Sequence, residues 1–207
     1  MNKIRALSLL RSATLVGLVS AALSGCAALI IGGALGTAMV VSDRRTSGVQ
    51  IEDQAIELKA LTRIRETVGD RGHISATSYN RTLLLTGEVA NEADRTALEQ
   101  SLSRIENLRS TVNELAVMGS SSMASRSSDT VITSRVKANY LDAKDLQANA
   151  IKVVTERGTV YLMGRVTERE AGRATELARG ISGVQKVVRV FEILTEAELT
   201  DLGTKKN

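Results

Sequence analysis

The sequence predicts an α+β protein made of two tandem α-β-β-α-β units, each a small mixed three-stranded sheet with two helices packed on one face. Two observations predict this fold. Residues 151–171 read as a strand, a tight turn, a second strand and the start of a helix, and residues 74–94 repeat that pattern. Each hairpin is preceded by a helical pattern and followed by a second helix and a closing strand. Since a unit of about 65 residues is close to the lower size limit for independent folding, we expect the two units to pack against each other.

The first 25 residues have the order of an export signal, with basic residues and then a short apolar core that cannot span a bilayer. Residues 23–26, Leu-Ser-Gly-Cys, resemble the lipobox of bacterial lipoproteins, which predicts that Cys26 is acylated and becomes the mature N-terminus. Ala27, in place of Asp, resembles an outer-membrane sorting address. The alternative is an ordinary signal with an incidental cysteine. Cys26 is the only cysteine of the chain, so an internal disulfide is excluded.

A second apolar stretch, residues 27–41, is short for a membrane-spanning helix. We interpret it as a membrane-proximal tether that lies against the lipid surface, with a re-entrant or transmembrane segment as the alternative. A polar linker follows it. Within that linker, Arg44 and Arg45 are expected close to the lipid headgroups, where each basic residue adds about 1 kcal/mol on an anionic surface.

The predicted organisation therefore has six segments. They are a lipoprotein signal peptide (1–25), a lipidated apolar tether and linker (26–50), a first folded unit (51–118), a linker (119–127), a second folded unit (128–194) and a polar C-terminal tail (195–207).

Each unit begins with a predicted helix, at residues 53–67 and 129–141. Apolar residues recur every fourth position on one side of each helix, which is typical of a face that covers a sheet. These residues are Ile56, Ala60 and Ile64 in the first helix and Ile132, Val136 and Tyr140 in the second. Asp53 and Asp129 stand where an N-cap is expected, and a carboxylate also suits the helix dipole there.

The hairpins carry turn and capping signals. Arg157-Gly158 supplies the turn of the second hairpin and residues 79–82 that of the first. Thr167 stands three residues before Glu170, which predicts a capping box at the start of the second helix, and Asn91 is the matching cap in the first unit. The second helices are expected at residues 91–105 and 167–181, and the closing strands at 112–117 and 184–194.

Charge and composition argue against a nucleic-acid partner. Residues 1–25 hold three of the 27 basic residues and no acidic one, so the processed chain carries a net charge of only +1. The chain has three tyrosines, one phenylalanine and no tryptophan, which leaves no base-stacking platform.

The sequence offers no catalytic residue, cofactor site or metal site, so we expect no enzyme. The one histidine, His73, is interpreted as a surface loop residue without a triad around it. Glu168 and Glu170 stand at a helix start, and capping accounts for both. No His, Asp or Glu cluster has metal-ligand spacing.

The helix at 129–141 carries the best candidate for a binding surface. Opposite its apolar face lies a stripe of mixed character, formed by Val131, Ser134, Arg135, Ala138 and Leu141. Exposed apolar side chains beside a basic residue suit shallow insertion among lipid headgroups, with Arg135 and Lys137 meeting phosphate. The alternative is that the stripe packs on the first unit. The equivalent helix of the first unit is interpreted as a solvated face of mixed charge.

Together these motifs carry a family resemblance. Paired α-β-β-α-β units, with residues 151–171 and the segment Ile-Ser-Gly-Val-Gln-Lys-Val-Val at 181–188, resemble BON domains. With the lipobox, residues 23–194 resemble the dual-BON outer-membrane lipoproteins. That resemblance implies a protein anchored in the inner leaflet of the outer membrane, facing the periplasm.

The resemblance also implies a function. Proteins of this kind bind anionic phospholipids, such as phosphatidylglycerol and cardiolipin, and support envelope integrity, often at division sites. It implies that the first helix of the second BON domain contacts lipid, although Val131 stands here where a relative has a tryptophan. The alternative is a scaffold on which the same stripe docks an envelope assembly or cell-wall-remodelling protein.

Overall fold

The computed structural model describes residues 43–204. The first repeat contains α3 (Ser47–Thr67), β1 (Gly72–Tyr79), β2 (Thr82–Val89), α4 (Glu92–Leu102), β3 (Ser110–Asn113) and β4 (Ala116–Val117). The second contains α5 (Met123–Asp142), β5 (Ile151–Glu156), β6 (Thr159–Thr167), α6 (Glu168–Arg179) and β7 (Lys186–Leu194), and α7 (Glu196–Thr204) follows. The predicted order of elements and the α+β class are confirmed. The signal peptide, Cys26 and the apolar tether lie outside the described residues.

Both sheets are mixed, with the second hairpin strand in the centre. In the first repeat β2 pairs antiparallel with β1 and parallel with β3 and β4. In the second repeat β6 pairs antiparallel with β5 and parallel with β7. The parallel pair in each repeat requires a crossover connection, which α4 and α6 provide.

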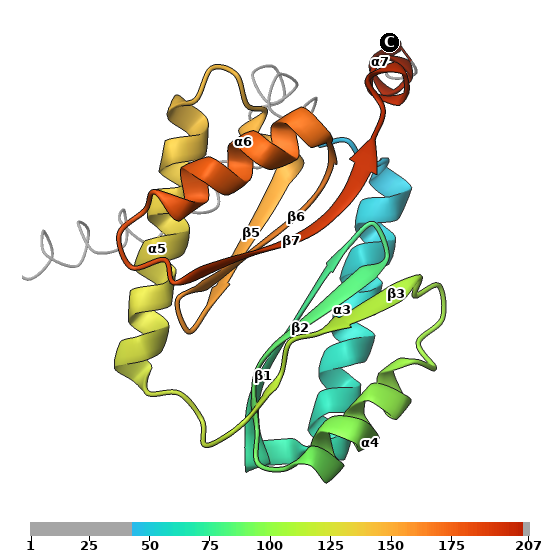
Figure 1. The fold of residues 1–207 in the computed structure, drawn as a ribbon. Coiled ribbons are helices and arrows are strands. Elements are labelled where there is room, and N and C mark those ends of the chain that lie inside the picture. Colours follow the sequence, from blue (N-terminus) through green and yellow to red (C-terminus); the bar gives the residue numbers. More distant parts are fainter. Residues whose placement is uncertain (1–42, 205–207) are drawn as a thin grey trace, which may run out of the picture. The chain divides into compact units, whose positions relative to one another are not determined.

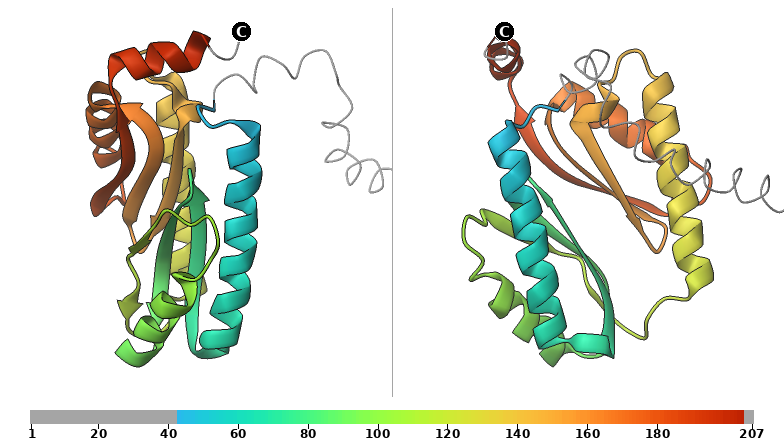
Figure 2. Two further views of the ribbon diagram at one scale, coloured as in Figure 1. Left: turned by 90° about the vertical axis from the view of Figure 1, so that its right-hand side faces the viewer. Right: turned by 180° about the vertical axis from the view of Figure 1, so that it is seen from behind.

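The central strands are buried on both faces, because helices cover one face of each sheet and the other sheet covers the second. Leu83 and Leu85 of β2 belong to the core beneath α3 and α4, whereas Leu84 points to the opposite face. There Leu84 and Tyr79 join Tyr161 and Met163 of the second repeat in a shared cluster. Figure 1 shows the two sheets between the helices of the two repeats, and Figure 2 shows α3 and α5 alongside their own sheets from two further sides. The two repeats therefore pack against each other, as predicted.

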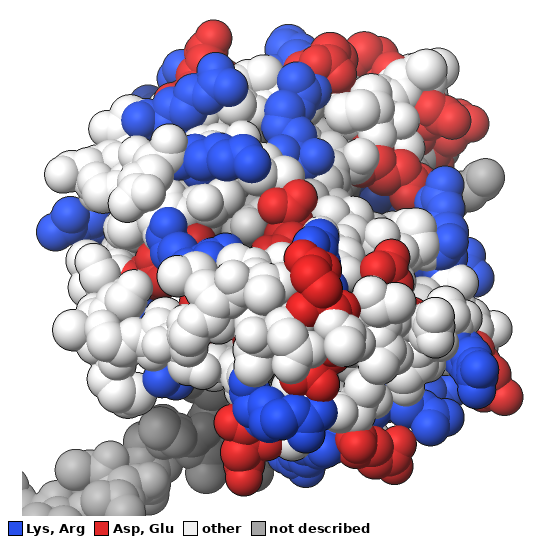
Figure 3. All heavy atoms as spheres, turned by 60° about the horizontal axis from the view of Figure 1, so that its bottom comes forward, with Lys and Arg blue, Asp and Glu red and all other residues white. Residues whose placement is uncertain are grey.

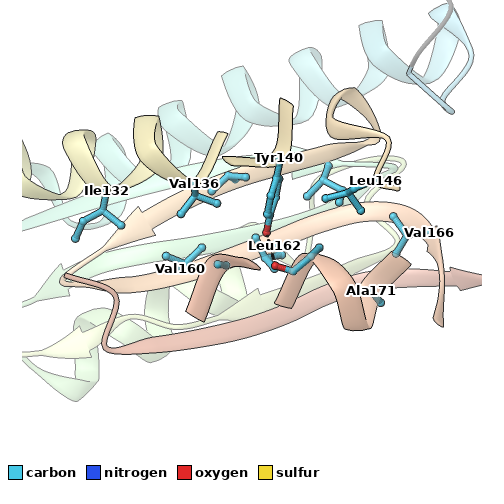
Figure 4. Close-up of a cluster of buried hydrophobic side chains, with 12 residues drawn as sticks. Ile132, Val136, Tyr140, Leu146, Val160, Leu162, Val166 and Ala171 are labelled. Carbon is cyan, nitrogen blue, oxygen red and sulfur yellow. Dashed lines mark hydrogen bonds between the residues drawn. The ribbon is translucent and has the colours of Figure 1, made fainter. Parts of the chain in front are cut away.

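The core of the second repeat illustrates how α5 is held. Ile132, Val136 and Tyr140 project from α5 toward Val160 and Leu162 of β6 (Figure 4). The Tyr140 hydroxyl donates a hydrogen bond of 2.8 Å to the carbonyl oxygen of Ala174 on α6. This bond satisfies a buried polar group and fixes the rotation of α5 about its own axis.

Both first helices begin earlier than predicted. The N-cap of α3 is Thr46 and that of α5 is Ser122, and each side chain accepts a hydrogen bond from a backbone N–H of the first turn. The predicted N-cap roles of Asp53 and Asp129 are therefore wrong. The predicted linkers are also partly helical, because α3 starts at Ser47 and α5 at Met123.

Asp53 and Asp129 instead hold the hairpin turns from within their helices. Asp53 accepts from the N–H groups of Asn80 and Arg81, at 2.8 and 2.7 Å. Asp129 accepts from those of Arg157 and Gly158, both at 2.8 Å. All four turn residues have positive φ, so their amides point away from the strand ladder and need another acceptor. The two carboxylates supply it.

Five further predictions can be compared with the structure. The capping box of Thr167 and Glu170 is present, and Asn91 caps α4. The closing strand of the first repeat is interrupted, because the buried side chain of Leu115 turns into the core between β3 and β4. The polar tail contains α7, which does not contradict the prediction, whereas His73 lies in strand β1 rather than in a loop.

Candidate functional site

The outward face of α5 contains all five residues of the predicted stripe. Ile132, Val136 and Tyr140 are buried beneath the helix. Val131, Ser134, Arg135, Ala138 and Leu141 are all exposed, with 47% of Val131 and 68% of Leu141 accessible to solvent. The stripe therefore does not pack on the first repeat. It forms a free surface, and lipid binding at this surface remains a prediction.

The basic residues of this surface are available to a ligand. Neither Arg135 nor Lys137 forms an ion pair with any of residues 43–204, and both are exposed. The Ser134 hydroxyl donates to the Thr130 carbonyl oxygen within the helix. The α5 face thus combines two large apolar side chains, two small residues and two free cations.

The equivalent face of α3 has a different character. Leu58 is 67% exposed, close to the value of Leu141, but two of the basic residues near it, unlike Arg65, are paired within residues 43–204. Lys59 contacts Glu106 and Arg63 contacts Glu66. Elsewhere, on the side shown in Figure 3, Lys and Arg side chains are interspersed with Asp and Glu. The prediction of an exposed mixed-charge face on α3 is correct for Lys59, Arg63 and Glu66. It is wrong for Asp53, which is buried.

The residues before α3 belong to the folded body, contrary to the expectation that they face lipid headgroups. Arg44 is only 7% exposed. Its guanidinium donates two bonds of 2.7 Å to the Glu170 carboxylate and others to Gln147 and the carbonyl oxygen of Arg165. Burial alone would raise the pKa of Glu170, but the bonds from Arg44 hold that pKa below its usual range. Arg44 therefore ties the segment before α3 to the second repeat.

Arg45 turns the other way and contacts the first repeat. It pairs with Asp43 and with the buried Asp53, the latter at 2.8 Å. Its guanidinium carbon lies 4.1 Å from the centre of the Tyr79 ring, a cation–π contact. No local sequence pattern indicated the contacts of Arg44 with Glu170 and of Arg45 with Asp53, because those carboxylates are not adjacent in the sequence.

Two acidic residues from different repeats, Glu88 and Glu156, are buried. Glu88 of β2 is fully buried, accepts from the Ser121 N–H and lies 3.6 Å from Arg157. Glu156 of β5 is 7% exposed, and one oxygen of each carboxylate has no hydrogen-bond partner. Burial, and then the nearby charges of Glu88 and Asp129, raise the pKa of Glu156 to about 7.

The described part of the chain contains neither a metal-binding cluster nor a membrane-spanning helix. No three His, Cys, Asp or Glu side chains among residues 43–204 are grouped so that they could hold a metal ion. Within the same residues, no helix has the length and apolar character needed to cross a membrane.

Comparison with known proteins identifies the repeats. The BON domain matches residues 52–119 and 128–195, the two α-β-β-α-β units described above. The chain belongs to the BON domain family.

Two relatives are informative. The chain is similar to the outer membrane lipoprotein DolP of Haemophilus influenzae, with 36% identity over 174 residues that cover 83% of this chain and 90% of that protein. It is also similar to the 21 kDa hemolysin of Actinobacillus pleuropneumoniae, with 27% identity over 151 residues, 72% of this chain and 78% of the other. The chain is thus a dual-BON outer membrane lipoprotein of the DolP type. Acylation of Cys26 remains a prediction.

Among solved structures, the chain matches CdsD, a structural protein of the type III secretion system of Chlamydia trachomatis. The two are 13% identical, and the match covers 70% of this chain and 97% of the other with a TM-score of 0.29. A similarity of that size carries no argument about this chain.

Proposed function

We propose that this BON protein is anchored to the outer membrane through acylated Cys26, faces the periplasm, and binds anionic phospholipid through the outward face of α5. Its activity is binding rather than catalysis. Through that binding it helps to maintain envelope integrity, with the division site as the expected place of action.

The observation that supports this proposal is the exposed stripe of α5. Burying a leucine or valine side chain in an apolar environment contributes about 1.5–3 kcal/mol. A basic residue near an anionic membrane adds about 1 kcal/mol. Leu141 and Val131 supply the apolar part, and Arg135 supplies the charge. Because Ser134 and Ala138 between them are small, the helix backbone can approach the lipid surface closely.

Non-enzymatic action is supported by the surroundings of the polar residues. His73 lies opposite Glu88 in the β1–β2 ladder, and no hydrogen bond that would activate a neighbouring hydroxyl links it to another side chain within residues 43–204. Glu170 is engaged by Arg44 and by the cap of α6. The relatives are named as a lipoprotein and a hemolysin, and neither name describes an enzyme.

Vesicle co-sedimentation of residues 42–207 tests the lipid-binding surface. This fragment contains all three core clusters and includes Arg44 and Arg45, which belong to the fold. Wild-type protein should pellet with phosphatidylcholine vesicles that contain phosphatidylglycerol or cardiolipin and not with phosphatidylcholine alone. Leu141→Glu should weaken binding about tenfold or more, because it replaces the proposed apolar contact of Leu141 with the lipid by a charge that anionic lipid repels.

Leu58→Glu is the matched control. Leu58 has the same exposure as Leu141 and lies on the equivalent helix, so this variant adds the same charge at a site outside the proposed surface. It should bind like the wild type. Equal loss in both variants, or equal binding by Leu141→Glu and the wild type, would show that α5 is not the lipid-binding element.

The scaffold hypothesis predicts a different result from the same surface. A photo-crosslinker at position 131 of the full-length lipoprotein in cells should give lipid adducts if α5 contacts the membrane. Protein adducts that persist after delipidation would show that the stripe docks a protein, and the lipid-binding proposal would then be wrong. In those cells Leu141→Glu should also raise detergent sensitivity and reduce enrichment at the division site.

A further inference from the structure

A cavity of about 350 Å³ lies beside the C-terminal part of α5, where the two repeats meet. Its volume is within the range of about 300–1,000 Å³ that is usual for small-molecule pockets. The first repeat contributes Tyr79 to its lining, and the segment before α3 contributes Arg45 and the acidic Asp43, whose carboxylate is bound by Arg45. The second repeat contributes Lys137 and Leu141 from α5 and Ile151 and Lys152 from β5.

The three cations of this cavity differ in how many of their hydrogen-bond donors already have a partner within the protein. Arg45 is held by Asp43 and Asp53. Lys152 donates to Glu57 at 2.9 Å and to the carbonyl oxygen of Ser78 at 3.2 Å, which leaves one of its three ammonium hydrogens. Lys137 has no partner among residues 43–204. Lys137 and Lys152, from two different elements that line the cavity, therefore both have hydrogen-bond donors left for a ligand.

The cavity also has an apolar side that continues the proposed lipid-binding surface. Leu141 lines it while remaining 68% exposed, and Ile151 and Tyr140 form the wall next to Leu141. A ligand that fits has a compact anionic group joined to an apolar part. A diester phosphate meets this requirement because it carries one negative charge and offers two free oxygens, one for each available lysine.

We propose that this cavity binds the phosphodiester group of a glycerophospholipid, with Lys137 and Lys152 as its ligands and Leu141 beside the acyl chains. The proposal deepens the proposed function, on which it rests, since it gives α5 a headgroup site in addition to an apolar surface. Because the cavity is lined by both BON domains, a bound headgroup contacts both repeats at once.

The test uses residues 42–207 with Lys137→Gln and Lys152→Gln, and Lys144→Gln as the charge-matched control. Lys144 is exposed near the end of α5 and does not line the cavity. Binding is measured with phosphatidylglycerol-containing vesicles. Chemical shifts of the Asn149 and Ile151 amides are followed with short-chain phosphatidylglycerol and, separately, with glycerol 3-phosphate and inorganic phosphate. Lys152→Arg, which keeps the charge, tests whether binding requires a cation at this position.

Lys137→Gln and Lys152→Gln should each weaken vesicle binding about five-fold, the equivalent of about 1 kcal/mol. Lys144→Gln should have less than half that effect, and Lys152→Arg should restore binding. Short-chain phosphatidylglycerol should shift the cavity amides. If only glycerol 3-phosphate or inorganic phosphate shifts them, the cavity is a site for soluble phosphate and the lipid assignment is overturned.

Two results separate this proposal from the function on which it rests. If all three lysine variants behave alike while Leu141→Glu abolishes binding, the cavity proposal fails and the α5 surface stands. If wild-type protein binds no vesicles, the proposed function fails, and the headgroup site falls with it unless short-chain phosphatidylglycerol still shifts the cavity amides.

Discussion

The first helices of the two repeats, α3 and α5, follow one plan on their inward sides and differ on their outward sides. When Asp53 is matched to Asp129, the inward residues Ile56, Ala60 and Ile64 correspond to Ile132, Val136 and Tyr140. Both sets are buried because each helix must cover a sheet. On the outward sides, Lys59 of α3 pairs with Glu106, whereas Arg135 at the equivalent position of α5 forms no ion pair within residues 43–204. The shared positions maintain the fold, and the differing ones are where a function can reside.

The two turn-binding aspartates show a second difference. Asp129 is bound by two turn amides. Asp53 is bound by the two equivalent amides and also by the Ser78 hydroxyl and Arg45. In the first repeat, Arg45 from the segment before α3 therefore also contacts the turn-binding aspartate. Within residues 43–204, Asp129 of the second repeat has no matching contact.

Asp53→Ala should have the largest effect on stability, about 3–5 kcal/mol of unfolding free energy, because it leaves buried donors and the Arg45 charge without an acceptor. Asp129→Ala should cost about 2–3 kcal/mol, since only the two amides lose their acceptor. Urea denaturation of residues 42–207 measures both. Equal losses would mean that the Arg45 and Ser78 contacts contribute nothing to the difference between the repeats.

Arg44→Ala should cost about 3 kcal/mol, because it leaves the Glu170 carboxylate buried without its cation. The pKa of Glu170 lies below its usual value, so the contribution of this pair is present above the unfolded pKa and is lost as the pH falls through the folded pKa. The difference between Arg44→Ala and the wild type should therefore shrink in acid, as urea denaturation at a series of pH values would measure. A difference that is the same at neutral and acidic pH would contradict this account.

Glu156→Gln should change how stability depends on pH. The folded pKa of about 7 lies above the ordinary value of 4.5, so Glu156 destabilises the fold progressively as the pH rises from about 4.5 to 7. Glutamine resembles the protonated acid, so the variant should gain at most about 3 kcal/mol at pH 8 and nothing at pH 4. A wild-type profile of unfolding free energy that is flat between pH 4.5 and 7 would rule out the raised pKa.

The smallest effect is expected at the hairpin turns. The first turn uses two non-glycine residues with positive φ, Asn80 and Arg81, whereas the second uses Arg157 and Gly158. Arg81→Gly should stabilise the protein by up to about 1 kcal/mol, because it removes a side chain from the left-handed region. Gly158→Ala should destabilise it by a similar amount, since its new Cβ would lie 3.0 Å from the Gln185 side chain. Thermal melts of both variants compare the two turns directly.

Local patterns were sufficient to predict most of the framework. The hairpins, the capping box at Thr167 and Glu170, and the inward stripes of α3 and α5 all follow from spacing and residue type, because they depend on neighbours along the chain. The exposed stripe of α5 was predictable for the same reason, as the complement of the buried one.

Features that depend on distant residues could not be predicted. Arg44 and Arg45 look like linker residues until Glu170 and Asp53 are placed beside them. Asp53 and Asp129 look like N-caps until the hairpin turns fold back onto them. The earlier helix starts did have a local signal, the capping side chains of Thr46 and Ser122, but the Ser-rich segments around them are also typical of linkers. The cavity beside α5 has no sequence signal, since its two sides come from different repeats.

The position of Arg44 has a mechanical consequence. A lipid anchor at Cys26 would transmit any pull from the membrane along the chain to the first residues of the folded body. Arg44, held by the Glu170 carboxylate, and Arg45, held by Asp53, are among the first to resist it, and they attach to different repeats. Tension on such an anchor would therefore be divided between the two BON domains before it reached any strand.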